Sequence, residues 1–229
     1  MITTLLFDLD NTVLNFDTGE RAALTEAFKA FGIDPSDALL EEYHRINIKY
    51  WEKLERGELS RIEVLEGRFD ELFANHGISC TGAEIQGVYE HTLAKYHDFM
   101  PGAEEMLEAL RGKYDMYIIS NGCAEIQAQR IKDAGLKRFF RDFFVSENIG
   151  YDKPDKRFFD HCALRIPNFK RENCLVIGDS LTSDISGGIN AGIKTCLYSH
   201  KRDMKFDKVR PNHVIYSLSE LETFLADLA

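Results

Sequence analysis

From Pro101 onward, short apolar runs alternate with segments of helical periodicity, and this alternation constrains the fold more than any other feature. Strands that alternate with helices form parallel sheets, because each helix carries the chain back to the end of the sheet where the next strand starts. The run from Leu5 to Leu9 has the composition of one further buried strand. We therefore predict an α/β fold with a doubly wound parallel sheet. Its later strands are predicted at 116–120, 143–145, 174–178, 195–198 and 214–216, and its helices at 103–110, 124–134, 156–164, 184–191 and 220–228.

Between the first strand and this alternating part lies a segment with a different pattern. Residues 18–96 repeat apolar side chains at the spacing of amphipathic helices, with breaks at 32–36, 57–60 and 77–82. Ser60 and Glu63 form the sequence signature of a capping box, which begins a helix. We predict a bundle of about four helices inserted into the α/β core. The expected domains are a core of 1–15 with 100–229 and a helical cap of 16–99, joined by hinges near 15–17 and 99–102.

Net charge, cysteine content and the length of apolar runs limit which partners and which cellular compartment we expect. The 229 residues carry a net charge of −10, which argues against binding a nucleic-acid polymer or an anionic membrane surface. Five scattered cysteines without a Cys-x-x-Cys pair favour reduced thiols over a disulfide framework or a zinc site. No apolar segment approaches the roughly 18 residues that a membrane span needs. We expect a cytoplasmic protein without a signal peptide, either a monomer or a homodimer.

Four polar segments follow predicted strands or lie in the loop after one. Because the carboxyl ends of parallel strands meet at one edge of a sheet, we expect these segments to converge there. Any one of them has a plain structural explanation, such as a turn at Ser120 or an acid in a first helical turn at Asp184. Their joint occurrence in this order favours a functional site. The segments are 8–12 (Asp-Leu-Asp-Asn-Thr), 120–122 (Ser-Asn-Gly), 153–154 (Lys-Pro) and 178–184.

The side chains of these segments suit a metal ion and a phosphate group. Ser120 and the backbone N–H groups that follow it would cradle an anion at a helix start. Lys153 adds a positive charge on a flexible stem. Together these groups predict a site for phosphoryl transfer. The oxygen-donor set that suits Mg²⁺ contains four carboxylates and no Cys or His: Asp8, Asp10, Asp179 and Asp184.

The four segments, in this order and context, resemble the four motifs of the haloacid dehalogenase superfamily over essentially the whole chain. The insertion after the first motif resembles the helical cap of one subfamily, and the core is then expected to be Rossmann-like. The stretches 178–196 (GDSLTSDISGGINAGIKTC) and 46–57 (INIKYWEKLERG) are similar to the bacterial pyrimidine 5′-nucleotidase branch. The resemblance implies an Mg²⁺-dependent hydrolase of nucleoside 5′-monophosphates with a role in nucleotide metabolism.

The resemblance also implies roles for individual residues. Asp8 would attack phosphorus and form an aspartyl-phosphate, and Asp10 would act as general acid and then general base. Asp10 further separates a phosphatase from a dehalogenase, since halide leaves without a proton. Ser120 and Asn121 would hold the phosphoryl oxygens, and Lys153 would offset charge. The implied metal ligands are the carboxylates of Asp8 and Asp179 and the backbone carbonyl of Asp10, with Asp184 binding either directly or through water.

The helical cap is expected to set the substrate. Candidate contacts to the leaving group are Phe16, Asn47, Tyr50 and Trp51, although aromatic residues at helical spacing are also common in cores. The predicted partner is a small phosphomonoester. The alternatives are a phosphatase or mutase for sugar phosphates or phosphoglycolate, and a non-catalytic binding module with the same fold.

Overall fold

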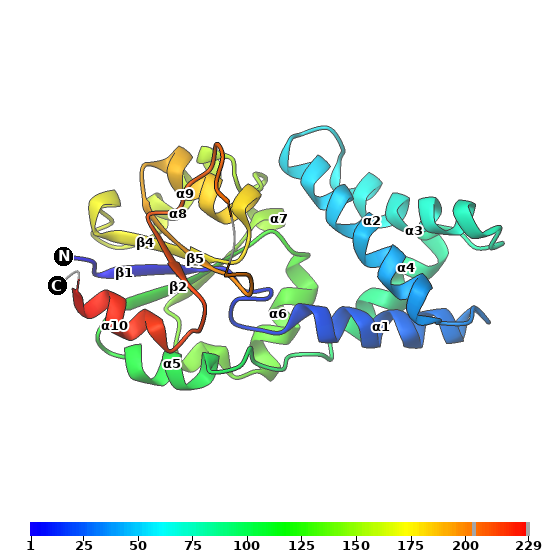
Figure 1. The fold of residues 1–229 in the computed structure, drawn as a ribbon, viewed down its shortest axis with the longest axis horizontal. Coiled ribbons are helices and arrows are strands. Elements are labelled where there is room, and N and C mark those ends of the chain that lie inside the picture. The colour runs from blue at the N-terminus through cyan, green and yellow to red at the C-terminus, as the bar shows by residue number, and fades with distance from the viewer. Residues whose placement is uncertain (203–204, 228–229) are drawn as a thin grey trace. The chain divides into compact units, whose positions relative to one another are not determined.

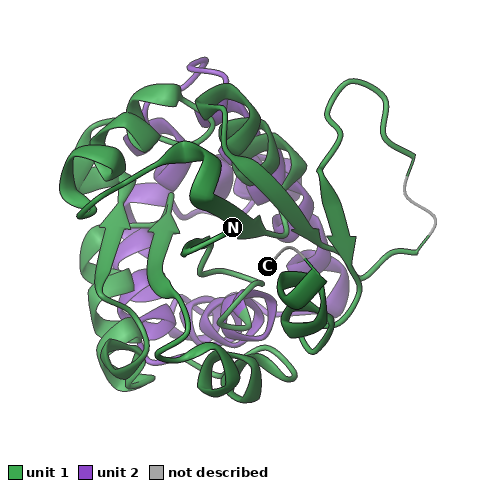
Figure 2. Cartoon of the chain, turned by 90° about the vertical axis from the view of Figure 1, so that its left-hand side faces the viewer, with its two compact units in different colours: residues 1–15, 97–229 green, residues 16–96 purple. Residues whose placement is uncertain are grey.

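The computed structural model describes residues 1–202 and 205–227 and divides into two compact units, 1–15 with 97–229 and 16–96 (Figure 2). Within the described residues of the first unit, six strands form one sheet in the order β3-β2-β1-β4-β5-β6, with every neighbouring pair parallel. The predicted α/β fold with a doubly wound sheet is confirmed. The strands are β1 (Thr4–Phe7), β2 (Asp115–Ser120), β3 (Asp142–Val145), β4 (Cys174–Gly178), β5 (Lys194–Tyr198) and β6 (His213–Ile215).

Helices cover both faces of this sheet, as Figure 1 shows for α8 and α9 on one side and α5 and α10 on the other. The strand side chains alternate between the two layers, because successive residues of a strand point to opposite faces. Leu5 and Phe7 pack in one apolar cluster and Leu6 packs in the other. The helices of this unit are α5 (Ala103–Leu110), α6 (Ala124–Asp133), α7 (Ser146–Ile149), α8 (Lys156–Arg165), α9 (Ser186–Ala191) and α10 (Glu220–Asp227).

The sheet order reverses at β1, and this reversal fixes where the chemistry lies. From β1 the chain adds β2 and β3 on one side and then returns to add β4, β5 and β6 on the other. In open α/β sheets, ligands bind outside the carboxyl ends of the strands at such a reversal, which here lies between β1 and its neighbours. Asp8 directly follows β1 and Asp179 directly follows β4.

Most predicted elements of the core agree with the structure within one or two residues, and at one helix start the structure has an additional turn that was not predicted. A helix was expected to begin at Asp184, whereas a π-helical turn spans Leu181–Ile185 and α9 begins at Ser186. The wide turn starts at Ser180, whose side chain accepts from the Ser183 N–H at 3.2 Å. Leu228, the last residue of the predicted C-terminal helix, lies outside the described residues.

The second unit contains the four expected helices, α1 (Phe16–Ala30), α2 (Asp37–Glu55), α3 (Arg61–His76) and α4 (Gly82–Leu93). The predicted capping box is confirmed, because the Ser60 N–H donates to the Glu63 carboxylate at 2.7 Å. The buried side chains of Tyr43, Phe69 and Tyr89 pack against one another in the bundle core. No helix in the described part of the chain has the length and apolar character of a membrane span.

Two glycines of α4 should respond in opposite ways to replacement by alanine. A Cβ at Gly82 would lie 2.1 Å from the Glu66 carbonyl oxygen, whereas a Cβ at Gly87 would meet nothing within 4 Å. We expect Gly82→Ala to lower the free energy of unfolding by about 1–3 kcal/mol through overpacking. Gly87→Ala should raise it by about 0.5–1 kcal/mol, because alanine loses less backbone entropy in a helix. Urea unfolding followed by circular dichroism measures both, and equal effects of the two substitutions would contradict the close contact at Gly82.

Candidate active site

The first carboxylate of the site follows the central strand. Asp8 comes directly after β1, and its N–H donates to the Ile177 carbonyl of β4 at 2.8 Å, which extends the sheet pairing by one residue. The residue is 7% exposed. A buried carboxylate is costly unless a cation or hydrogen-bond donors face it, so its partners decide what the site can do.

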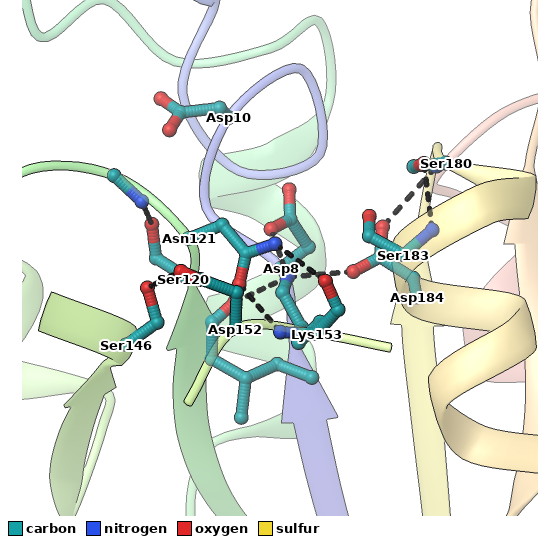
Figure 3. Close-up of polar contacts among 12 residues, drawn as sticks. Asp8, Asp10, Ser120, Asn121, Ser146, Asp152, Lys153, Ser180, Ser183 and Asp184 are labelled. Atoms are coloured by element: carbon teal, nitrogen blue, oxygen red, sulfur yellow. Dashed lines mark hydrogen bonds and ion pairs between the residues drawn. The ribbon is translucent and has the colours of Figure 1, made fainter. Parts of the chain in front are cut away.

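Lys153 is the cation that faces Asp8. Its side chain is 1% exposed, and the ammonium donates to Asp8 Oδ1 at 2.7 Å, Asp184 Oδ1 at 2.6 Å and the Ile119 carbonyl at 2.9 Å (Figure 3). All three N–H donors of the ammonium are thereby used. The lysine comes from the loop before α8, and the two carboxylates come from the residue after β1 and from the π turn, so segments remote in sequence meet at one point.

Asn121 fixes the backbone that carries this lysine. Its side-chain amide donates to the Lys153 carbonyl at 2.8 Å, and its oxygen accepts from the Lys153 N–H at 2.8 Å. The two hydrogen bonds form a closed pair between one side chain and the backbone of one residue. Asn121 was predicted to hold phosphoryl oxygens, and the structure gives it this additional role in placing Lys153.

Three carboxylates lie close enough to share one cation. Asp8, Asp179 and Asp184 each offer an oxygen, and these oxygens lie within 4.8 Å of one another. Gly178 makes room for this group, because a Cβ there would lie 2.2 Å from Asp184 Oδ2. Among the described residues, the carboxylate of Asp10 does not belong to the cluster; the backbone contribution expected of Asp10 stays a prediction.

The charges of the cluster do not balance. Burial raises the pKa of Asp8 to about 8; Lys153 opposes this shift, while Asp184 and Asp10 add to it. Burial likewise raises the pKa of Asp179 well above its usual range, and Asp8 and Asp184 reinforce the effect. Burial alone would lower the pKa of Lys153, but the two carboxylates beside it outweigh burial and raise it. Two buried carboxylates that contact one ammonium, beside the half-buried carboxylate of Asp179, offer oxygen donors only and fit a hard divalent cation such as Mg²⁺.

Ser120 ends β2 and is 1% exposed. Its hydroxyl oxygen accepts from the Gly122 N–H at 3.1 Å and from the Gln127 amide at 2.9 Å. The loop therefore turns tightly around the hydroxyl before α6 begins.

Asp10 has two partners that the sequence did not reveal. Gln127 donates to one of its carboxylate oxygens at 2.6 Å, and Arg130 forms an ion pair with the other. Both partners are buried residues of α6, although arginine and glutamine are mostly exposed in folded proteins. In Figure 3 the Asp10 carboxylate lies apart from the group formed by Asp8, Lys153 and Asp184.

The cap candidates all lie in the helical unit. Asn47 is 3% exposed; its amide donates to Glu20 Oε1 at 2.6 Å, and its oxygen accepts from Arg68 at 2.7 Å. Trp51 is half-buried, and the Arg61 guanidinium lies 5.6 Å from the centre of its ring. Phe16 begins α1. Their roles in substrate binding stay predictions.

The polar network around Asn47 continues to a histidine. His44 Nδ1 lies 2.6 Å from Glu20 Oε2, and this hydrogen bond raises the pKa of His44 despite its partial burial. At its other end Arg68 donates to Gln86 at 3.0 Å. The network satisfies polar groups that would otherwise be unpaired inside the bundle.

Comparison with solved structures gives a close match over the whole chain. The crystal structure of the HAD-hydrolase YfnB from Bacillus subtilis, bound to magnesium, superposes with a TM-score of 0.93. The two sequences are 37% identical, and the match covers 98% of each chain.

Two curated relatives also match this chain along most of their length. The pyrimidine 5′-nucleotidase PynA of Streptococcus pneumoniae is 36% identical, over 95% of this chain and 92% of PynA. The pyrimidine 5′-nucleotidase YjjG of Escherichia coli is 31% identical, over 96% of each chain. The family model for haloacid dehalogenase-like hydrolases matches residues 2–192. The chain therefore belongs to the haloacid dehalogenase-like hydrolase family and is an enzyme of the hydrolase class.

Proposed function

We propose that this hydrolase is an Mg²⁺-dependent phosphatase for nucleoside 5′-monophosphates, with pyrimidine nucleotides as its preferred substrates. The observation that carries the proposal is the contact of Lys153 with both Asp8 and Asp184, beside a third carboxylate, Asp179. Such a site combines a nucleophile, a fixed positive charge and donors for a metal, which are the parts that phosphoryl transfer needs. The names of PynA and YjjG support the choice of substrate.

In the first step Asp8 attacks phosphorus, a bond forms between its carboxylate oxygen and phosphorus, and the bond from phosphorus to the nucleoside O5′ breaks. Asp10 gives its proton to O5′, so that a neutral hydroxyl leaves. In the second step water attacks the aspartyl-phosphate, Asp10 takes a proton from that water, and the bond to Asp8 breaks. Free phosphate results, Asp8 is again a carboxylate, and Asp10 again carries its proton.

The remaining residues bind and orient. Lys153 holds one oxygen of Asp8 and directs the other toward substrate, while Ser120 and Asn121 supply donors to the phosphoryl oxygens. Mg²⁺, held by Asp8, Asp179 and Asp184 and by the Asp10 carbonyl, would offset the negative charge that develops on those oxygens. We further propose that unit 16–96 is a cap that selects the leaving group through Phe16, Asn47 and Trp51.

A substrate panel tests the proposal. Phosphate release from uridine, thymidine, adenosine and guanosine 5′-monophosphates, a hexose 6-phosphate and phosphoglycolate should be measured with Mg²⁺ and with EDTA. We expect kcat/KM for the pyrimidine nucleotides to exceed that for the sugar phosphate by about 10-fold or more, and EDTA to abolish release. Equal rates with the sugar phosphate would contradict the nucleotidase assignment, and no release from any ester would contradict phosphatase activity.

A further inference from the structure

A closed ring of hydrogen bonds surrounds the Asp10 carboxylate. Arg130 Nη1 donates to Asp10 Oδ1 and, at 2.8 Å, to Gln127 Oε1. Gln127 Nε2 completes the ring by donating to Asp10 Oδ2 at 2.6 Å. Each carboxylate oxygen thus has its own donor, so the ring fixes the rotation of the carboxylate as well as its position.

The ring extends to the phosphate-binding loop. The Gln127 amide nitrogen also donates to Ser120 Oγ at 2.9 Å. One amide therefore links the side chain expected to transfer the proton with the side chain expected to bind the phosphoryl group. A substrate that changes the hydrogen bonds of Ser120 changes those of Gln127, and through it those of Asp10.

The fold is shaped to accommodate this arrangement. Gln127 and Arg130 are 2% and 1% exposed. A buried guanidinium is costly without a hydrogen-bonded anion, and Asp10 supplies that anion. A Cβ at Gly122 would lie 2.3 Å from the Gln127 amide nitrogen, so glycine there leaves space for the ring.

Asp10 needs such support because of its place in the chain. It lies three positions after Phe7, the last residue of β1, and precedes Asn11, which has a left-handed backbone with φ of 55°. Its side chain is 27% exposed. A carboxylate in an exposed turn samples several rotamers, whereas general acid catalysis requires hydrogen-bond geometry to the leaving oxygen.

We propose that Arg130 and Gln127 are positioning residues that orient Asp10 for proton transfer to the leaving oxygen, and that Gln127 couples this orientation to Ser120. The inference rests on the proposed phosphatase function, in which Asp10 is the general acid. Arg130 and Gln127 act through Asp10, and their loss should therefore affect mainly those substrates whose leaving group requires a proton.

Two phosphomonoesters separate this role from a structural one. The leaving alkoxide of uridine 5′-monophosphate, or of whichever panel nucleotide or sugar phosphate reacts fastest, is strongly basic and needs the proton. The phenolate of p-nitrophenyl phosphate is weakly basic and departs without one. The quantity to compare is kcat/KM, since it reports the steps up to the phosphorylation of Asp8. Variants are Arg130→Met, Arg130→Lys, Gln127→Leu and Asp10→Asn, with Arg171→Met as the control.

We expect Arg130→Met and Gln127→Leu to lower kcat/KM for the alkyl phosphate about 10- to 100-fold. The same substitutions should lower kcat/KM for p-nitrophenyl phosphate less than about three-fold. Arg130→Lys should recover part of the loss. The control residue Arg171 pairs with Asp160 at 2.6 Å and is not part of this ring. Its replacement should change kcat/KM for the two substrates by the same factor. In an Asp10→Asn background, Arg130→Met should add less than about two-fold to the loss, because both substitutions remove the same interaction.

Equal losses with both substrates, or an undiminished effect of Arg130→Met in the Asp10→Asn background, would overturn the positioning role. A failure of the wild-type enzyme to release phosphate from either ester would instead overturn the proposed function. Should Arg130→Met not fold, Gln127→Leu decides the question, because it breaks the ring without removing the buried charge's partner.

Discussion

We expect Asp8→Asn to lower phosphate release by at least about 10⁴-fold while leaving the protein folded, since loss of a nucleophile removes the covalent route altogether. Asparagine has nearly the shape of aspartate but is a poor nucleophile. The substitution also removes one of the two buried carboxylates that pair with the single ammonium of Lys153. The free energy of unfolding measured without metal should therefore not fall, which separates lost chemistry from lost structure. Phosphate release and urea unfolding are the two measurements.

Asp133→Asn is the matched control for this substitution. Asp133 is an exposed acid of α6 whose carboxylate accepts from the Gln129 side chain at 2.6 Å. It lies outside the carboxylate cluster, so its replacement should leave phosphate release unchanged. Retention of activity by Asp8→Asn within about ten-fold of the wild type would show that another group attacks phosphorus.

The parts of the molecule that follow from local pattern were predictable. A run such as Leu5 to Leu9 is apolar enough to be a buried strand wherever it lies, and Ser60 with Glu63 begins a helix through contacts within one turn. The strand ends then bring Asp8 close to Lys153 because parallel strands share an edge. The order of strands and polar segments in the sequence was enough to predict that Asp8 and Lys153 lie close together.

The partners of Asp10 could not be found in that way. Gln127 and Arg130 lie more than a hundred positions further along the chain, on a helix whose polar residues give no sign of burial. Their burial depends on where α6 packs, which is a tertiary property. The early helical turn before α9 was missed for a similar reason, because the Asp184 side chain takes up contacts with Ser180 and Lys153 that local pattern does not report.

Lys153→Met should have the largest combined effect on activity and stability of any substitution in the site. Replacing a buried ion pair can be neutral, but removing one partner leaves the other charged and unpaired, at a cost of about 3–5 kcal/mol in the free energy of unfolding. Here two carboxylates, Asp8 and Asp184, lose their cation at once. Phosphate release should also fall about 10²- to 10³-fold, because a fixed positive charge beside the transferred group is lost.

The exposed Lys156 provides the comparison. It forms an ion pair with Asp160 one helical turn away, at 2.7 Å, and Lys156→Met should cost no more than about 1 kcal/mol because solvent screens the pair. Adding Asp184→Asn to Lys153→Met should restore part of the lost stability by removing one unpaired carboxylate, without restoring activity. If Lys153→Met unfolded at the same urea concentration as the wild type, the ammonium would not be what stabilises the buried carboxylates, and the charge balance inferred for the site would be wrong.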